Sequence, residues 1–82
     1  MSVEILKFEA DWCAPCKALR PVWEELEGNF SDKATFQVID IAAKYNITSV
    51  PTVVIVKNGE ITDHIVGLVK KDRLEEALNK VI

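Results

Sequence analysis

The sequence has little of what is typical of membrane proteins or of nucleic-acid-binding proteins. None of its apolar runs approaches the roughly 20 residues that a membrane-spanning helix needs. Basic residues do not cluster and the net charge is −3, so nothing indicates binding to nucleic acid or to an anionic membrane. Residues 1–7 lack the basic segment and the apolar stretch of a signal peptide, so we expect a cytoplasmic location.

Metal ligands are equally scarce. The chain has two cysteines and one histidine, His64, whereas a tetrahedral zinc site takes four ligands, so we expect no metal. Both cysteines lie in the motif Trp-Cys-Ala-Pro-Cys-Lys, residues 12–17. A disulfide that closes so small a loop stabilises a fold by only about 2 kcal/mol. In a cytoplasmic protein such a pair is more often catalytic than structural. The spacing therefore favours redox chemistry over a structural disulfide or half of a zinc site.

The position of the motif predicts different roles for the two thiols. It lies where an apolar strand gives way to an amphipathic helix, so Cys13 falls at the helix N-terminus. There the unpaired backbone N–H groups and the helix dipole stabilise a thiolate, which is the nucleophile in thiol–disulfide exchange. We expect Cys13 to attack. Cys16, one turn further along, is expected to be less exposed and to resolve the mixed disulfide.

Alternating and helical hydrophobic patterns predict one small α/β domain over residues 1–82. The Asn58-Gly59 pair is a strong signal for a two-residue hairpin between the last two strands. Pro21 falls inside the long helix and is expected to kink it. The order β-α-β-α-β-β-α indicates a four-stranded mixed sheet flanked by helices, its first two strands parallel through a right-handed crossover. The strands are predicted at residues 3–10, 35–39, 52–57 and 60–66, and the helices at residues 14–30, 40–45 and 70–82.

Several short motifs, in a fixed order along almost the whole chain, resemble those of the thioredoxin family. They are Phe8, Ala10, the motif at residues 12–17, Pro21, the Ile-Thr-Ser-Val-Pro-Thr segment at 47–52, the Lys-Asn-Gly-Glu segment at 57–60, and Val66-Gly67. The resemblance implies a thioredoxin-like fold and a dithiol–disulfide oxidoreductase that acts on disulfide-containing proteins. It also implies recharging by a thioredoxin reductase or a similar dithiol donor, with no cofactor beyond the Cys13–Cys16 disulfide.

The same resemblance implies a substrate-binding rim around the cysteines. Trp12, Ala14 and Pro15 would form its edge, with Ala14 replacing the commoner glycine. Val50 would pair through its backbone with an extended substrate segment, as an added strand does. Pro51 matches a proline that follows a cis peptide bond, and Gly67 matches a glycine that lets a substrate backbone approach.

The chain also departs from the family pattern. The family's opening strand and helix have no counterpart here, so we expect residues 35–39 to form an exposed sheet edge, which is prone to pairing. Lys7 stands where most thioredoxins carry a buried acid, and Glu9 replaces a tryptophan. A neutral Lys7 could act as a base, whereas a charged Lys7 would stabilise thiolates and make the couple more oxidising. Alternatively, Lys7 pairs with Glu9 or reaches solvent. Lys17 could add positive potential at the site.

The leading interpretation is a small cytoplasmic protein-disulfide reductase, expected to be a monomer. A glutaredoxin-like reductase that draws electrons from glutathione is the nearest alternative, because the short fold would suit it. Trp12, the Ala-Pro spacer and the lack of a Gly-Gly pair after the last strand argue against it. The other alternative is a non-catalytic subunit that uses the thioredoxin surface for binding. The intact cysteine pair argues against that interpretation.

Overall fold

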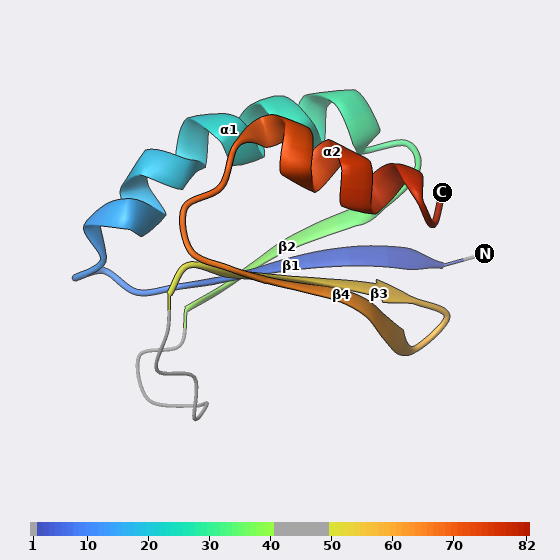
Figure 1. The fold of residues 1–82 in the computed structure, drawn as a ribbon, viewed down its shortest axis with the longest axis horizontal. Coiled ribbons are helices and arrows are strands. Elements are labelled where there is room, and N and C mark those ends of the chain that lie inside the picture. The colour runs from blue at the N-terminus through green and yellow to red at the C-terminus, as the bar shows by residue number, and fades with distance from the viewer. Residues whose placement is uncertain (1, 41–49) are drawn as a thin grey trace.

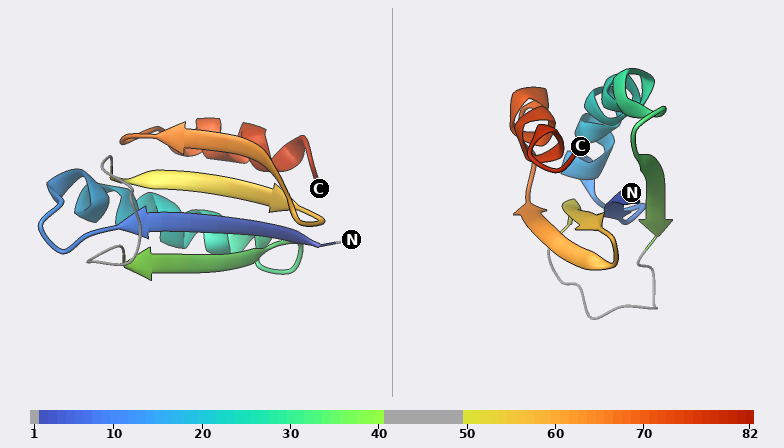
Figure 2. Two further views of the ribbon diagram at one scale, coloured as in Figure 1. Left: turned by 90° about the horizontal axis from the view of Figure 1, so that it is seen from below. Right: turned by 90° about the vertical axis from the view of Figure 1, so that its right-hand side faces the viewer.

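The computed structural model describes residues 2–40 and 50–82. These residues form a four-stranded mixed sheet with strand order β2-β1-β3-β4. Both described helices cover the same face of the sheet, as the end-on view in Figure 2 shows. The elements, in chain order (Figure 1), are β1 (Val3–Glu9), α1 (Ala14–Phe30), β2 (Thr35–Asp40), β3 (Thr52–Lys57), β4 (Glu60–Val66) and α2 (Lys71–Asn79).

Strand β1 is one of the two central strands of the sheet and leads directly to the cysteine motif. It pairs in parallel with β2, through α1 as the crossover, and antiparallel with β3. The β3–β4 hairpin turns at Asn58 and Gly59, whose φ angles of 52° and 85° are those of the left-handed region. Glycine and asparagine adopt such angles most readily, so the hairpin predicted from this pair is confirmed.

The core lies between the sheet and the two helices. The residues of β1 alternate between its faces, so Val3, Ile5 and Lys7 face the helices. Helix α1 continues past Pro21 to Phe30. The fully buried apolar side chains come from β1, β3 and both helices and include Ile5, Leu19, Leu26, Ile55, Leu74 and Leu78.

The four-stranded mixed sheet and the exposed edge at β2 are confirmed. Asp40, predicted to begin a short helix, instead ends β2, because it pairs in register with Glu9 of β1. The remainder of that predicted helix lies outside the described residues. The last helix is shorter than predicted and spans Lys71–Asn79. The first strand ends one residue earlier than predicted, at Glu9.

Candidate active site

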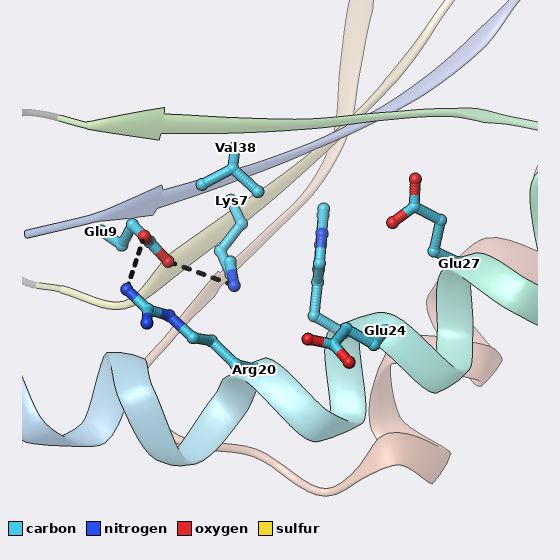
Figure 3. Close-up of a pocket in the computed structure, with 7 residues that line it drawn as sticks. Lys7, Glu9, Arg20, Glu24, Glu27 and Val38 are labelled. Carbon is cyan, nitrogen blue, oxygen red and sulfur yellow. Dashed lines mark hydrogen bonds and ion pairs between the residues drawn. The ribbon is translucent and has the colours of Figure 1, made fainter.

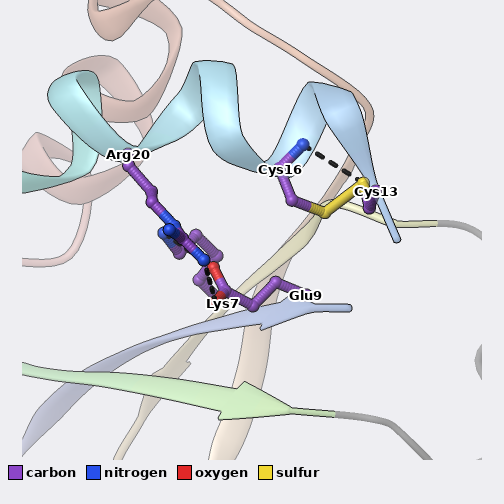
Figure 4. Close-up of polar contacts among 5 residues, drawn as sticks. All are labelled: Lys7, Glu9, Cys13, Cys16 and Arg20. Atoms are coloured by element: carbon purple, nitrogen blue, oxygen red, sulfur yellow. Dashed lines mark hydrogen bonds and ion pairs between the residues drawn. A yellow bond between two sulfur atoms is a disulfide. The ribbon is translucent and has the colours of Figure 1, made fainter. Parts of the chain in front are cut away.

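The two cysteines form a disulfide at the beginning of α1 (Figure 4), with their Cα atoms 5.3 Å apart. Cys13 is the N-cap residue, and its Sγ accepts a hydrogen bond from the backbone N–H of Cys16 across 3.1 Å. Pro15 lies in the first turn of the helix. Backbone N–H groups in this turn have no intrahelical acceptor, so the lack of an N–H in proline costs no hydrogen bond. The sulfur of Cys13 thus occupies the position that a capping oxygen usually takes, facing the positive end of the helix dipole.

The cysteines lie at the edge of a small apolar cluster of their own. Phe8, near the end of β1, and Ala10, which follows the strand, are buried with them, and Val50 packs against this group. Cys16 is 0% exposed and Cys13 is 3% exposed, so Cys13 keeps the only exposed surface of the pair. Trp12, immediately before Cys13, is mostly exposed. The little exposed surface that the pair has therefore belongs to Cys13.

Pro51 comes just before β3, whose first residue, Thr52, pairs with Phe8 near the cysteine end of β1. The Val50–Pro51 peptide bond is cis. The N–H of Gly67 donates a hydrogen bond to the carbonyl oxygen of Pro51 across 2.8 Å. Gly67 has a φ angle of 98°, which glycine adopts without strain. The structure therefore brings Val50, Pro51 and Gly67 to the end of the sheet that carries the cysteine motif, and their role in binding a substrate stays a prediction.

In the part of the chain that the structure describes, Lys7 is the one charged side chain among the largest fully buried residues. It is 1% exposed, so the interpretation that it reaches solvent is wrong. Its Nζ atom lies 3.2 Å from Oε1 of Glu9 and 5.2 Å from the centroid of the Trp23 ring. The predicted pairing with Glu9 is confirmed. The aromatic face of Trp23 gives the buried ammonium group a second favourable neighbour.

Arg20, on α1, is a residue of this region that the sequence analysis missed. Its guanidinium group contacts Oε2 of Glu9 across 3.4 Å. Arg20 lies four residues after Cys16, on the same side of the helix. This spacing is the feature of the sequence from which its position near the motif could have been predicted. Lys7, Glu9 and Arg20 line a pocket of about 250 Å³ between α1 and β2 (Figure 3), together with Trp23, Glu24, Glu27 and Val38.

The remaining predicted site residues lie on the surface around the motif. Ala14, Pro15 and Lys17 are exposed in the first turn of α1. Within residues 2–40 and 50–82, no group of three or more His, Cys, Asp or Glu side chains is arranged to hold a metal ion. None of the helices in this part of the chain is both long and apolar enough to cross a membrane.

Two thiols held at a helix N-terminus can cycle between a dithiol and a disulfide, because the thiolate is stabilised there. This geometry defines a thiol–disulfide oxidoreductase. Comparison with known proteins agrees: the family model described as Thioredoxin matches residues 2–80. The thioredoxin of Staphylococcus epidermidis is 42% identical over 84 residues, which cover 95% of this chain and 81% of that protein. Those of Staphylococcus haemolyticus and Staphylococcus aureus are 40% and 39% identical over the same shares. The chain belongs to the thioredoxin family.

Proposed function

We propose that this thiol–disulfide oxidoreductase works mainly as a reductase of protein disulfides, with Cys13 as the nucleophile and Cys16 as the resolving residue. One observation carries this assignment of roles: Cys13 caps α1 and keeps the only exposed surface of the pair, whereas Cys16 is fully buried. A substrate sulfur can approach Cys13 without any rearrangement of the helix. Cys16 can react only with a sulfur that is already bonded to Cys13.

The proposed reaction has two exchange steps. The Cys13 thiolate attacks one sulfur of the substrate disulfide, forms a mixed disulfide and releases the other substrate sulfur as a thiolate, which takes up a proton. Cys16 then loses its proton and attacks Cys13 Sγ, which forms the Cys13–Cys16 disulfide and releases the second substrate thiol. Two electrons pass from the protein to the substrate, and the two substrate thiolates take up two protons, one released by Cys16 and one from solution. A dithiol donor returns them to the protein.

We propose that the substrate lies across the surface around Cys13. Trp12, Ala14 and Pro15 would line one side of it. The backbone of Val50 would pair with an extended segment of the substrate, next to the cis bond at Pro51. At Gly67, a side-chain Cβ would meet no atom within 4 Å, so the space above this residue is open to an approaching chain.

The electron donor we propose is a thioredoxin reductase or a comparable dithiol protein, and the cellular location we propose is the cytoplasm. Both exchange steps use only the thiols of Cys13 and Cys16, the two cysteines of the chain, so the reaction we propose needs no cofactor besides their disulfide. We propose that the protein works as a monomer.

Oxidation of NADPH in a mixture of the protein, a bacterial thioredoxin reductase and a disulfide substrate would test the donor. Sedimentation analysis would test the monomer, and a dimer would contradict it.

Trapping of the mixed disulfide tests the two cysteine roles. The reduced Cys16→Ser variant is expected to form a stable adduct with an aromatic disulfide, because the serine hydroxyl that replaces the resolving thiol cannot attack Cys13. The matched Cys13→Ser variant keeps the buried thiol and is expected to form little adduct. Mass spectrometry measures both. An adduct that forms faster on Cys16 in Cys13→Ser than on Cys13 in Cys16→Ser would reverse the assignment.

The reduction potential of the couple tests the direction of electron flow. Equilibration of the wild-type protein with glutathione or dithiothreitol redox buffers gives this potential. A value near the roughly −270 mV of thioredoxin supports the reductase function. A value between roughly −180 and −120 mV, the range of isomerases and dedicated oxidants, would instead indicate disulfide formation or shuffling.

A further inference from the structure

We infer that Arg20 is a positioning residue of the thiol–disulfide site: it holds the Glu9 carboxylate against the buried Lys7 ammonium and gives this charge cluster a net positive charge that favours the reduced protein. Lys7, Glu9 and Arg20 are here called the charge cluster. The inference rests on the proposed function, since it concerns how readily the Cys13–Cys16 disulfide accepts electrons.

The two oxygens of Glu9 each face one cation (Figure 3). Oε1 lies 3.2 Å from Nζ of Lys7, and Oε2 lies 3.4 Å from the guanidinium group of Arg20. Oε1 is buried and makes no hydrogen bond within the described residues, so its partner there is the charge of Lys7. Glu9 therefore bridges a buried cation and a surface cation, and the bridge fixes the orientation of its carboxylate.

The burial of Lys7 makes this orientation important. An ammonium group removed from water needs a counter-charge, and loss of that partner leaves an uncompensated buried charge. The Trp23 ring, 5.2 Å from Nζ, is favourable but neutral. Because Glu9 is partly accessible, its carboxylate could turn toward solvent if nothing held its second oxygen. Arg20, on α1, keeps this second oxygen in place through the contact of its guanidinium group.

The residues of the charge cluster lie on the two elements that flank the cysteine motif, β1 before it and α1 after it. Arg20 follows Cys16 by four residues, and side chains at this spacing are neighbours on a helix surface, with Cβ atoms about 5–6 Å apart. Lys7 and Glu9 lie on the strand that leads into the cysteine motif and face α1 (Figure 4). The formal charges of the three side chains sum to one positive charge. A positive charge near a thiol stabilises its thiolate, and a stabilised reduced form makes a disulfide more oxidising.

The acidic residues that share the pocket act less on the cysteines. Glu24 and Glu27 line the pocket from later turns of α1, further from Cys16 along the helix than Arg20 is, and both are exposed. Arg20 is exposed as well, so salt screens all three side chains over about 8–10 Å, and it is the distance along the helix that separates them. The side chain that combines proximity to Cys16 with a direct contact to the buried pair is Arg20.

The experiment measures the equilibrium constant for reduction of the protein by glutathione in the wild type and in three variants. Arg20→Gln removes a positive charge and is expected to shift the equilibrium about two- to fivefold toward the disulfide, as for one partly screened charge. Glu9→Gln removes a negative charge and is expected to shift it in the opposite direction. Arg20→Lys keeps the charge and is expected to restore most of the wild-type value.

Arg73→Gln is the matched control. The Arg73–Asp63 pair has a similar distance, 3.5 Å, and similar side-chain exposure, 42% and 19% against 49% and 14% for Arg20 and Glu9. This pair joins α2 to β4, away from the charge cluster. The Arg73→Gln variant is therefore expected to leave the equilibrium constant unchanged.

Opposite shifts separate the inference from structural damage, which has no reason to change sign between Arg20→Gln and Glu9→Gln. An unchanged constant in Arg20→Gln, a shift of the same sign in both variants, or an equal shift in Arg73→Gln would each overturn the inference. Circular dichroism confirms that each variant is folded. The proposed function fails separately, if the wild-type dithiol does not reduce protein disulfides, because the exchange constant with glutathione remains measurable in that case.

Discussion

The Lys7 ammonium group lies between the carboxylate of Glu9, at 3.2 Å, and the ring of Trp23, at 5.2 Å. The effect of a substitution at Lys7 on the free energy of unfolding is therefore expected to depend on the charge that the new side chain places beside Glu9. Lys7→Asp places a second carboxylate in a buried position and is expected to lower the free energy of unfolding by about 3–5 kcal/mol. Lys7→Met fills a similar volume without a charge and leaves Glu9 paired with Arg20, so it is expected to cost less.

Urea unfolding of the two variants measures the difference. We further expect Lys7→Asp to lower the reduction potential, because a negative charge disfavours the thiolates of the reduced form. A Lys7→Asp variant as stable as Lys7→Met would show that Lys7 and Glu9 do not interact as described. An unchanged potential in Lys7→Asp would remove Lys7 from the residues that tune the couple.

The two tryptophans offer a test that separates stability from function. Trp23 is buried and makes an edge-to-face contact with Phe36, with ring centroids 5.2 Å apart. Trp23→Ala is expected to cost about 3–5 kcal/mol in unfolding free energy, as large-to-small substitutions in cores do. Trp12 is mostly exposed, so Trp12→Ala is expected to change stability by no more than about 0.5 kcal/mol.

The rate of disulfide exchange tests whether Trp12 contributes to substrate binding. If Trp12 lines the substrate surface, Trp12→Ala is expected to slow the reduction of a protein disulfide more than the reduction of a small aromatic disulfide. Equal effects on both substrates would remove Trp12 from the proposed rim. A loss of several kcal/mol in Trp12→Ala would contradict its exposed position.

Local signals in the sequence predicted much of the fold and the reactive pair. The Asn58-Gly59 turn and the Cys13–Cys16 spacing each depend on neighbouring residues, and both are found as expected. The end of β2 was missed, because Asp40 joins the strand through its pairing with Glu9, a partner distant in the sequence. Pairing between strands overrides local preference in such cases.

The surroundings of Lys7 show the same limit at the site. The sequence placed Glu9 on the same strand face, two residues away, and so predicted their pairing. It did not predict Arg20, because that contact joins a strand to a helix 11 residues further on. Nor did it predict that Trp23 lies beside the ammonium group. These relationships depend on how α1 packs on the sheet, which the hydrophobic pattern of either element alone does not specify.

Two glycine substitutions are expected to change stability in opposite directions. Gly28 lies within α1, and an added Cβ there would meet no atom within 4 Å. Gly28→Ala is expected to stabilise the fold by about 0.5–1 kcal/mol, because alanine loses less backbone entropy in a helix. Gly59 has a φ angle of 85°, so Gly59→Ala is expected to destabilise the fold by a similar amount or more.

Thermal unfolding of both variants measures the two effects, and neither substitution touches the cysteine motif. The exchange rate with an aromatic disulfide is therefore expected to match the wild type in both. Stabilisation by Gly59→Ala would contradict the left-handed turn at the β3–β4 hairpin.

The ion pair between Lys71 and Glu25 joins α2 to α1 and predicts a dependence of stability on pH. Nζ of Lys71 donates a hydrogen bond to Oε1 of Glu25 across 2.7 Å. This bond, with the nearby negative charges of Glu25, Glu75 and Asp72, raises the pKa of Lys71 above its ordinary value of 10.5 despite some desolvation. A raised folded-state pKa means that the pair's contribution is complete below the unfolded-state pKa. The contribution is lost as the pH rises through the folded-state value.

The Lys71→Gln, Glu25→Gln and double variants form a cycle that isolates this pair from other groups titrating at high pH. At pH 7 the coupling energy is expected to be favourable but small, because the pair is largely exposed and screened by salt. It is expected to fall toward zero as the pH rises above that ordinary value of 10.5, and to weaken in high salt at pH 7. Urea unfolding at each pH gives the four free energies. A coupling energy that grows between pH 7 and the alkaline limit would contradict the sign of the shift.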